Sequence, residues 1–440
     1  MGGDGNCKLD GDSAALIPVP QLRAWRRAFA FGVLNGAAFQ LGFSFSHPST
    51  VLVTFATRLT NSELGAGLIG TIAGAGWFLP QLFVVSYIES QPYKMPIYRL
   101  ASTLRLLSWA MMMLTTIAFF GASKMLTAIC FFLFYAFFML MGGVAGLAFM
   151  DIVTRTIPPR RRGAFWGARN LFGGLLGVLS GLIVREILAM ERALPFPNNY
   201  MLLMLFSLIS YAIAFSLFMV IDEPPDLLTQ PRLKLIGELR DLFKLLRDNR
   251  QFRLLILTRL ILDSSSIAGP FYATFAIRVL GAHDSVMGTF LILQTITGLL
   301  FTPFWSYIND AKGCATATRV CIFLLPIVPL MAFAISAVSV ISGSGDWMLT
   351  AWMIIYALIG AISSGPGIAF TNYLLELAET ERRPLLIASF NTIDGLVMFF
   401  PMLGGLIVHS IGYHAVFGFA AISALCAIVI AKGLFTHREP

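Results

Sequence analysis

Residues 125–150 read MLTAICFFLFYAFFMLMGGVAGLAFM and contain no charged side chain. A helix needs about 20 predominantly apolar residues to cross the hydrocarbon core of a bilayer, so this stretch is long enough to span a membrane. Soluble domains carry roughly 25% charged residues, whereas this chain of 440 residues has 12% charged and 57% hydrophobic residues. The chain therefore cannot cover itself with a polar surface in water, which excludes a cytosolic enzyme.

Apolar stretches of similar length recur along the chain and predict twelve membrane-spanning helices. We expect these helices at about 28–56, 65–88, 98–120, 124–150, 163–188, 200–221, 254–280, 286–308, 319–342, 347–373, 385–409 and 414–435.

The positive charges support this count of twelve helices. When successive loops are assigned to alternating sides of the membrane, most Lys and Arg residues fall on the side of the N-terminus. The loops of the other side contain only Arg58, Lys124, Arg185, Arg192 and Arg278. Cytoplasmic loops are enriched in Lys and Arg, so we expect a multi-pass protein of the cell membrane with both termini in the cytoplasm. We attribute the net charge of +8 to this topology and expect no nucleic-acid partner.

The longest polar segment lies in the middle of the chain and predicts its division. We expect a cytoplasmic N-terminal segment, a six-helix bundle, a cytoplasmic linker, a second six-helix bundle and a cytoplasmic tail at 1–27, 28–221, 222–253, 254–435 and 436–440. Within the linker, apolar residues at helical spacing from Leu235 to Leu246 favour an amphipathic helix on the membrane surface. A solvated linker helix has the same pattern and stays an alternative.

The two halves of the chain repeat each other. Phe55-Ala-Thr-Arg58-Leu59 matches Phe275-Ala-Ile-Arg278-Val279, and Gly181-Leu-Ile-Val184 matches Gly405-Leu-Ile-Val408. Several further weak matches keep the same order and an almost constant offset, which indicates a duplication of half the chain.

Two parallel six-helix repeats are the arrangement of the major facilitator superfamily, and the sequence resembles that superfamily over about residues 24–436. The stretch Trp305-Ser-Tyr-Ile-Asn-Asp310-Ala-Lys-Gly313 is similar to its Asp-containing cytoplasmic loop, whereas Ser86 to Lys94 keeps only the length of that loop. The loop Asp151-Ile-Val-Thr-Arg155 is also similar. The resemblance implies an all-α integral membrane fold of two six-helix bundles and the transport of a small solute.

The resemblance also implies gating by cytoplasmic loop residues, in which Asp310 would cap a neighbouring helix N-terminus and hold the two halves together in the outward-facing state. The predicted gating set is Asp310, Gly313, Glu89, Lys94, Asp151 and Arg155. The fourth span contains no Arg and the fifth contains no Gly-Pro pair, two departures that weigh against multidrug antiport.

Ionisable residues inside a membrane are costly and are by default candidates for function. Asp263 lies about nine residues into the seventh span, hence ~13 Å deep, and Arg259 is one turn before it. Asp263 is predicted to exchange a proton or bind a cationic group; a standing ion pair with Arg259 is the structural alternative. A second candidate set, at similar depth, comprises Asp394, Asn391, Arg169 and Asn170. Arg169 and Arg259 have the alternative of reaching the interface as end-of-helix charges.

Neutral polar residues of the spans are candidates for the lining of a central cavity. In the first span Gln40, Ser44 and His47 share one helix face, and Asn35 lies one turn earlier. Gln294 in the eighth span and Tyr356 in the tenth are weaker candidates, together with Thr295, Ser363 and Ser364. Such residues also hold helices together, and His47 has the further alternative of an interfacial histidine.

No catalytic motif is present: the sequence has neither a nucleotide-binding glycine loop nor a His-Glu-x-x-His pair, and its five cysteines are scattered. We expect no enzyme activity, no cofactor and no metal site. The leading hypothesis is a monomeric secondary transporter in the lipid bilayer that moves a small solute by alternating access, coupled to protons through Asp263 or Asp394. A non-transporting receptor or assembly factor is the alternative, and passive facilitation is a further one.

Overall fold

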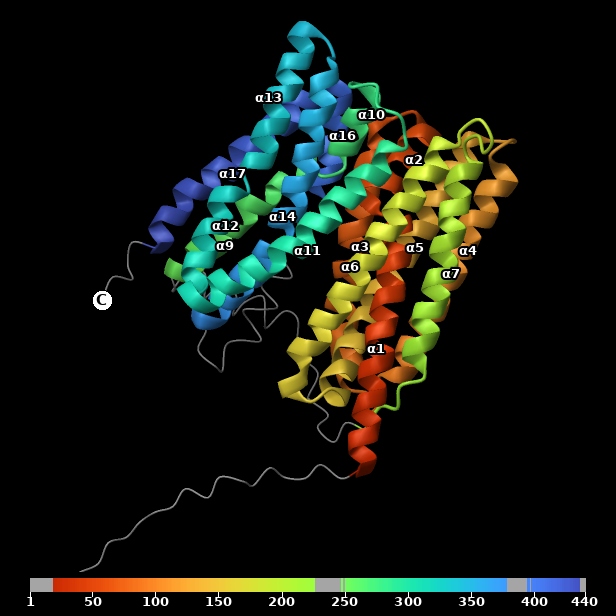
Figure 1. Ribbon diagram of the computed structural model, residues 1–440, viewed down its shortest axis with the longest axis vertical. Coiled ribbons are helices and arrows are strands. Elements are labelled where there is room, and N and C mark those ends of the chain that lie inside the picture. The colour runs from red at the N-terminus through yellow and green to blue at the C-terminus, as the bar shows by residue number, and fades with distance from the viewer. Residues whose placement is uncertain (1–18, 226–246, 248–249, 378–393, 396, 436–440) are drawn as a thin grey trace, which may run out of the picture.

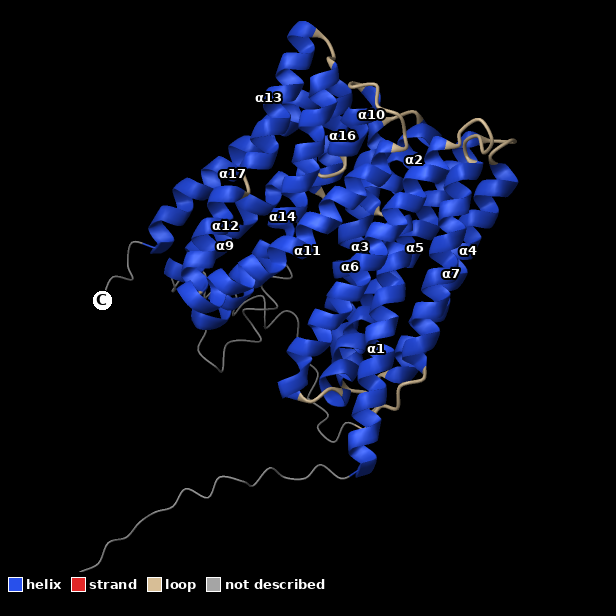
Figure 2. Ribbon diagram, in the orientation of Figure 1, coloured by secondary structure: helices blue, strands red, loops and turns tan. Residues whose placement is uncertain are grey.

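The computed structural model describes residues 19–225, 247, 250–377, 394–395 and 397–435. All the regular secondary structure of these residues is helical, as Figure 2 shows. The elements of the first half are α1 (Val19–Phe45), η1 (Pro48–Leu52), α2 (Val53–Thr60), α3 (Glu63–Glu89), α4 (Met95–Phe119), α5 (Lys124–Thr156), α6 (Pro159–Ala189) and α7 (Asn198–Met219). Those of the second half are α9 (Arg250–Asp263), η2 (Ser264–Ala268), α10 (Phe271–Arg278), α11 (Val286–Lys312), α12 (Cys314–Leu324), α13 (Ile327–Ser342), α14 (Asp346–Leu377), α16 (Phe400–Ser410) and α17 (Tyr413–Phe435).

The predicted all-α membrane fold is confirmed. Within the described residues, eleven helical segments are long and apolar enough to cross a membrane, and the shorter α16 is the described end of the span expected at 385–409. Some helices run past their expected ends; α5 continues to Thr156 because nothing interrupts it before Ile157 and Pro158, and the residue before a proline is disfavoured in a helix. The amphipathic helix expected in the linker falls on residues outside those described.

The helices form two groups, α1 to α7 and α9 to α17, which lie side by side in Figure 1. The groups contact each other mainly where α3 meets α16 and α6 meets α11. Glycines permit this approach: a Cβ atom on Gly288 would lie 2.4 Å from the backbone nitrogen of Arg185, and one on Gly67 would lie 2.5 Å from the carbonyl oxygen of Pro401. Backbones that touch in this way give a close interface between the two groups.

The first span of each group is broken at the same relative position. In the first half, Pro48 opens the π-helical turn η1 ahead of α2. In the second half, the 3-10 turn η2 and Pro270 precede α10. Pro270 lies 222 residues after Pro48, so the break belongs to the repeat. Proline removes a backbone donor and interrupts the helix ladder, which explains both breaks.

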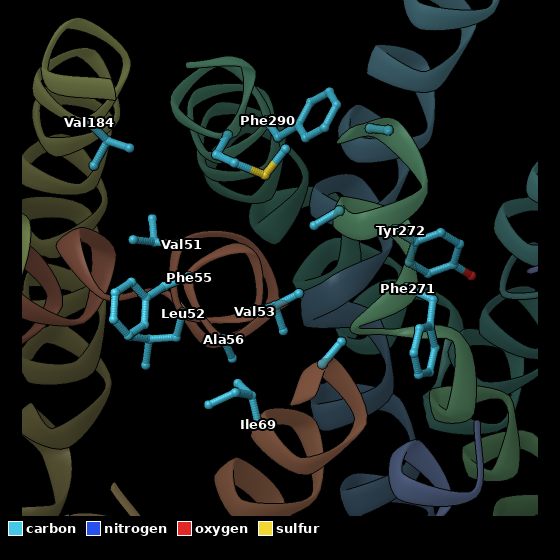
Figure 3. Close-up of a cluster of buried hydrophobic side chains, with 14 of the residues drawn as sticks. Val51, Leu52, Val53, Phe55, Ala56, Ile69, Val184, Phe271, Tyr272 and Phe290 are labelled. Atoms are coloured by element: carbon cyan, nitrogen blue, oxygen red, sulfur yellow. The ribbon is translucent and has the colours of Figure 1, made fainter. Parts of the chain in front are cut away.

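The segments after these breaks, α2 and α10, meet and join the two groups at what we call the closed end of the molecule. A continuous cluster of buried apolar side chains fills this end, and Figure 3 shows part of it, with Val51 and Phe55 from the first half and Phe271 and Phe290 from the second. From the closed end the two groups diverge toward the ends where α1 and α9 begin, as Figure 1 shows. We call this second side the terminal end.

Candidate functional site

A cavity of about 320 Å³ lies between the two groups of helices. Its walls come from α1 and α6 of the first half and from α11 and α14 of the second. Its polar lining consists of Gln40, His47, Arg169, Asn170, Gln294, Thr295, Thr302 and Ser363. A cavity lined from both halves, which we call the central cavity, is positioned to respond to any movement of one half against the other.

The structure places most of the predicted lining residues in the central cavity. Gln40 of α1, Arg169 and Asn170 of α6 and Gln294 of α11 all line it, together with His47 from the turn between α1 and η1. Gln40 and His47 were predicted from their shared face in the first span. Arg169 and Asn170 were predicted as polar residues within the fifth span, and Gln294 as a polar residue of the eighth.

Four predicted lining residues lie outside the central cavity: Ser44, Tyr356, the buried Asn35, and Ser364, which contacts Thr302. Ser44 is only 1% exposed, at the contact of α1 with Gly177 of α6. Tyr356 is buried in the second half, where its ring stacks on Phe290 at 3.9 Å between centroids. Both residues turn toward neighbouring helices rather than toward the cavity, a difference that a polar side chain alone does not reveal. Asn391 falls outside the described residues.

Arg169 is held inside the bundle by α1. Its Nη1 donates to the Asn35 side-chain oxygen at 2.7 Å and to the Gly32 carbonyl at 2.8 Å. Asn35 is buried and donates in turn to the Ala214 carbonyl of α7 at 2.7 Å. A Cβ atom on Gly36 would lie 2.1 Å from the Arg169 side chain, so the glycine is what allows the arginine to cross α1. Arg169 is therefore a fixed part of the cavity wall and not an arginine that reaches for the interface.

The second half contains an ionic cluster around Arg259. Arg259 Nε lies against Asp263 Oδ2 and 3.5 Å from Asp394 Oδ1, and its guanidinium lies 5.2 Å from the centre of the Phe370 ring. None of the three charged side chains is more than 24% exposed. The sequence assigned the two carboxylates to separate sets, whereas the structure brings them to the same nitrogen. Two carboxylates that share one guanidinium carry one negative charge in excess, which a proton can neutralise.

Ion pairs connect the two halves at the closed end. Arg58 Nη1 contacts Asp284 Oδ2 at 2.6 Å, and Arg278 Nε contacts Glu63 Oε1 at 3.1 Å. The other Arg58 nitrogen contacts Glu191 at 2.7 Å. Arg278 lies 220 residues after Arg58, and Asp284 lies 221 residues after Glu63. Each half thus supplies an arginine to an acid of the other half, and the repeat is the reason for this reciprocity.

Further contacts reinforce this network. The Tyr200 hydroxyl donates to Asp284 at 2.6 Å, and His283 lies 3.3 Å from Glu191. The hydrogen bond from Arg58 lowers the pKa of Glu191, which lies in the loop before α7. The sequence analysis noted Arg58 and Arg278 as marks of the repeat and as loop charges, and not as members of ion pairs. The signal it missed is an arginine followed five or six residues later by an acid in each half.

The predicted loop residues of the first half gather at the terminal end. The Lys94 side chain is 1% exposed, with Nζ 3.4 Å from the Glu89 carbonyl and 3.7 Å from Asp151, and Asp151 also pairs with Arg155. Glu223, which the sequence did not single out, accepts hydrogen bonds of 2.7–2.8 Å from the backbone nitrogens of Lys94 and Met95 and so caps the first turn of α4. A carboxylate at a helix N-terminus is stabilised by the free N–H groups and the helix dipole.

The corresponding loop of the second half has a different arrangement. Asp310 is exposed and accepts a hydrogen bond from the side chain of Asn309 at 3.0 Å. Gly313 separates α11 from α12 with a φ of +83°, a conformation that favours glycine. Among the described residues, no hydrogen bond or ion pair joins Asp310 to the first half, so the latch expected for the outward-facing state is not formed in this conformation.

Comparison with known proteins finds a family model that matches the second half of the chain and solved structures of similar fold. Residues 254–440 match the model of the Major Facilitator Superfamily. No curated protein sequence matches the chain. Among solved structures, a bacterial homologue of the iron transporter ferroportin in the inward-facing state has a TM-score of 0.68 at 15% identity and covers 94% of this chain and 99% of its own. The D-xylose-proton symporter has a TM-score of 0.65 at 16% identity, with coverages of 93% and 98%. The nucleoside transporter NupG has a TM-score of 0.65 at 15% identity, with coverages of 94% and 100%. At these identities the likeness is one of fold.

Proposed function

Since this multi-pass membrane protein has the major facilitator fold and that superfamily's sequence pattern in its second half, we propose that it is a secondary transporter that moves a small solute by alternating access. The observation that carries the proposal is the central cavity, which both halves line. Apolar side chains and ion pairs seal the two halves together at the closed end. In a chain of this class the two bundles, 28–221 and 254–435, would rock about such a site. We propose that transport is its sole activity and that it acts as a monomer without enzyme chemistry.

The proposed orientation follows from charge. The alternation of spans in the sequence assigns most Lys and Arg residues to the side on which α1 begins, which favours the cytoplasm for the terminal end and the cell membrane for the protein. The closed end would then face outward, and the conformation described here would be inward-facing. In the outward-facing state the ion pairs of Arg58 and Arg278 would separate, and the terminal loops that contain Asp151 and Asp310 would approach each other.

We propose proton coupling at the cluster of Arg259, Asp263 and Asp394. These three side chains are largely buried, where an excess charge is costly. Protonation of one carboxylate leaves a neutral arginine–carboxylate pair. The proton therefore lowers the electrostatic cost of a state that buries the cluster more deeply. This is the differential binding between two states that coupling requires.

The solutes of the similar structures do not select a solute for this chain. They are a bacterial homologue of an iron transporter, a D-xylose-proton symporter and a nucleoside transporter, which share the fold and differ in solute. The chain's own residues must provide that information.

The test is transport by the full-length protein in liposomes, with a solute first found by a thermal-stability screen of metabolites. A ligand that binds only the folded protein raises its stability with the logarithm of its concentration. Asp263→Asn and Asp394→Asn are expected to abolish uptake driven by a pH gradient and to retain solute exchange. The matched control is Asp346→Asn, an exposed aspartate in the first turn of α14.

The outcomes separate the alternatives. Gradient-driven uptake that survives in both cluster variants removes these residues from coupling. Exchange without any gradient-driven uptake in the wild-type protein identifies a passive facilitator. Absence of both flux and ligand-dependent stabilisation contradicts transport and favours a receptor or assembly role.

A further inference from the structure

Arg105 of α4 is a buried arginine without an acidic partner. Its side chain is 4% exposed, and no hydrogen bond or ion pair connects it to another residue in the described part of the chain. Its guanidinium lies instead among three rings, 4.4 Å from the centre of Phe138, 5.0 Å from Phe215 and 5.6 Å from Phe39. Cation–π contacts compensate a buried arginine only in part. By contrast, Arg259 in the other half has two carboxylates.

Arg105 faces a second cavity of about 320 Å³ inside the first bundle, which we call the N-bundle cavity. Arg169 lines the same cavity, so two guanidinium groups face one space, and its described lining contains no carboxylate. Phe39 and Arg169 also line the central cavity. The N-bundle cavity therefore adjoins the proposed transport site, and a solute in the central cavity is next to it.

The remaining walls of the N-bundle cavity are mostly flat and apolar. Trp77, Tyr98, Phe149, Trp166 and Phe215 contribute rings, and Asn35 and Gln81 contribute amides. Glycines of α5 keep the space available: a Cβ atom on Gly142 would lie 3.2 Å from the Arg105 guanidinium, and one on Gly146 would lie 2.8 Å from the Trp77 ring. Larger residues at either position would push these side chains out of place.

We propose that the N-bundle cavity binds an organic anion, with its acidic group between Arg105 and Arg169 and its planar apolar body against the aromatic walls. An arginine fork binds a carboxylate or phosphate through two parallel hydrogen bonds, and flat rings give apolar contact at low entropic cost. Two positive charges without a counter-ion repel a metal cation. An uncharged solute would leave the positive charges of Arg105 and Arg169 without a counter-ion and some of their N–H donors unsatisfied. The inference deepens the proposed function, because this anion would be the transported solute.

Binding by the purified full-length protein tests the proposal independently of flux. The probes are benzoate and indole-3-acetate, each compared with its neutral amide, benzamide or indole-3-acetamide, and with inorganic phosphate. We expect the two acids to raise the thermal unfolding temperature and the amides to have no effect. Arg105→Gln should weaken binding of the acids at least roughly tenfold, because it removes one partner of a buried charge pair. The control Arg185→Gln, at an exposed arginine paired with Glu186, should leave binding unchanged.

A second variant shows that lost binding is not lost folding. Arg105→Met replaces an unpaired buried charge by an apolar chain, so without ligand it should unfold at a higher temperature than the wild type and still fail to bind the acids. Equal stabilisation by acids and amides, or no stabilisation by either acid, overturns the proposal. Phosphate as effective as the acids indicates a site for the bare anion and overturns the organic class. Acid binding without flux in liposomes leaves this site intact and refutes transport instead.

Discussion

Arg58 and Asp284 form an ion pair of 2.6 Å across the two halves of the molecule, and the side chain of Asp284 is only 8% exposed. The equivalent residues of the repeat, Arg278 and Glu63, form the same pair in the opposite direction at 3.1 Å. Both pairs lie where α2 and α10 meet, beside the apolar cluster that contains Phe55 and Phe275. Charge and apolar contact therefore close the same end, and any opening there must break two symmetric pairs at once.

Substitution of Arg58 tests this seal. Arg58→Gln leaves Asp284 without its arginine and should destabilise the closed end by about 2 kcal/mol, a shift of roughly thirtyfold toward separation of the two halves. Spin labels at Ala122→Cys and Ser344→Cys, on exposed loops of the two halves, should report a longer distance in a background without native cysteines. Arg278→Gln should act similarly. Distances that do not change in either variant contradict a closing role for these pairs.

The pair of Arg58 and Glu191, which lies within the first half, predicts an acid-sensitive stability. Hydrogen bonding to Arg58 lowers the pKa of Glu191 below its ordinary value of 4.5. In the unfolded chain, away from Arg58, the carboxyl would titrate at its ordinary pKa. Glu191 therefore stabilises the folded state fully above pH 4.5, and this stabilisation is lost as the pH falls through the lowered pKa.

Thermal unfolding in detergent at a series of pH values measures this effect. His283 also faces Glu191, so the titration is best made in a His283→Gln background. The difference in unfolding temperature between this protein and the same protein with Glu191→Gln should shrink below pH 4.5 and not between neutral pH and that point. The change should be small, because Glu191 is 38% exposed. A difference that does not vary with pH assigns the acid response to other groups.

The sequence was sufficient to predict the spans, because membrane crossing depends on local composition and length. The stretch at 125–150 became the middle of α5, and the repeat of Phe55 to Leu59 in Phe275 to Val279 became the matched segments α2 and α10. Helix ends were less predictable: α5 stops at a proline that follows the apolar stretch by several residues.

Contacts between distant helices could not be predicted in the same way. Gln40 and His47 were expected on one face of the first span, and both line one cavity, although α1 ends at Phe45 and His47 lies just beyond it. That Asp263 and Asp394 meet at Arg259 depends on the packing of distant segments. Arg105 appears in the sequence only as a charge within a span, and its lack of an acidic partner becomes visible only when α5 and α7 surround it. The roles of these residues stay proposals.

The hydrogen bonds of Asn35 predict a local effect on stability. Asn35→Ala removes the acceptor of Arg169 and the donor to the buried Ala214 carbonyl. Leaving such groups unsatisfied should cost about 1–3 kcal/mol of unfolding free energy. Thermal unfolding in detergent measures the change, with Asn170→Ala, at an exposed position of the central cavity, as the control. Equal unfolding temperatures for the two variants contradict a positioning role for Asn35.

The contact of α6 with α11 predicts a strong effect of one methyl group. The Cβ atom of Gly288→Ala would lie 2.4 Å from the Arg185 nitrogen and 2.5 Å from the Gly181 carbonyl oxygen, and backbone atoms cannot move aside as a flexible side chain can. The helices must separate, at a cost of about 1–3 kcal/mol typical of overpacking. The matched control is Gly167→Ala in α6, where an added Cβ meets nothing within 4 Å and alanine favours the helix by about 1 kcal/mol. The unfolding temperature should fall in the first variant and stay or rise in the second.

If the two halves also rock about this contact, Gly288→Ala should slow solute exchange, whereas Gly167→Ala should not. A fall in both variants assigns the effect to a general intolerance of α6 and α11 to substitution rather than to their close approach.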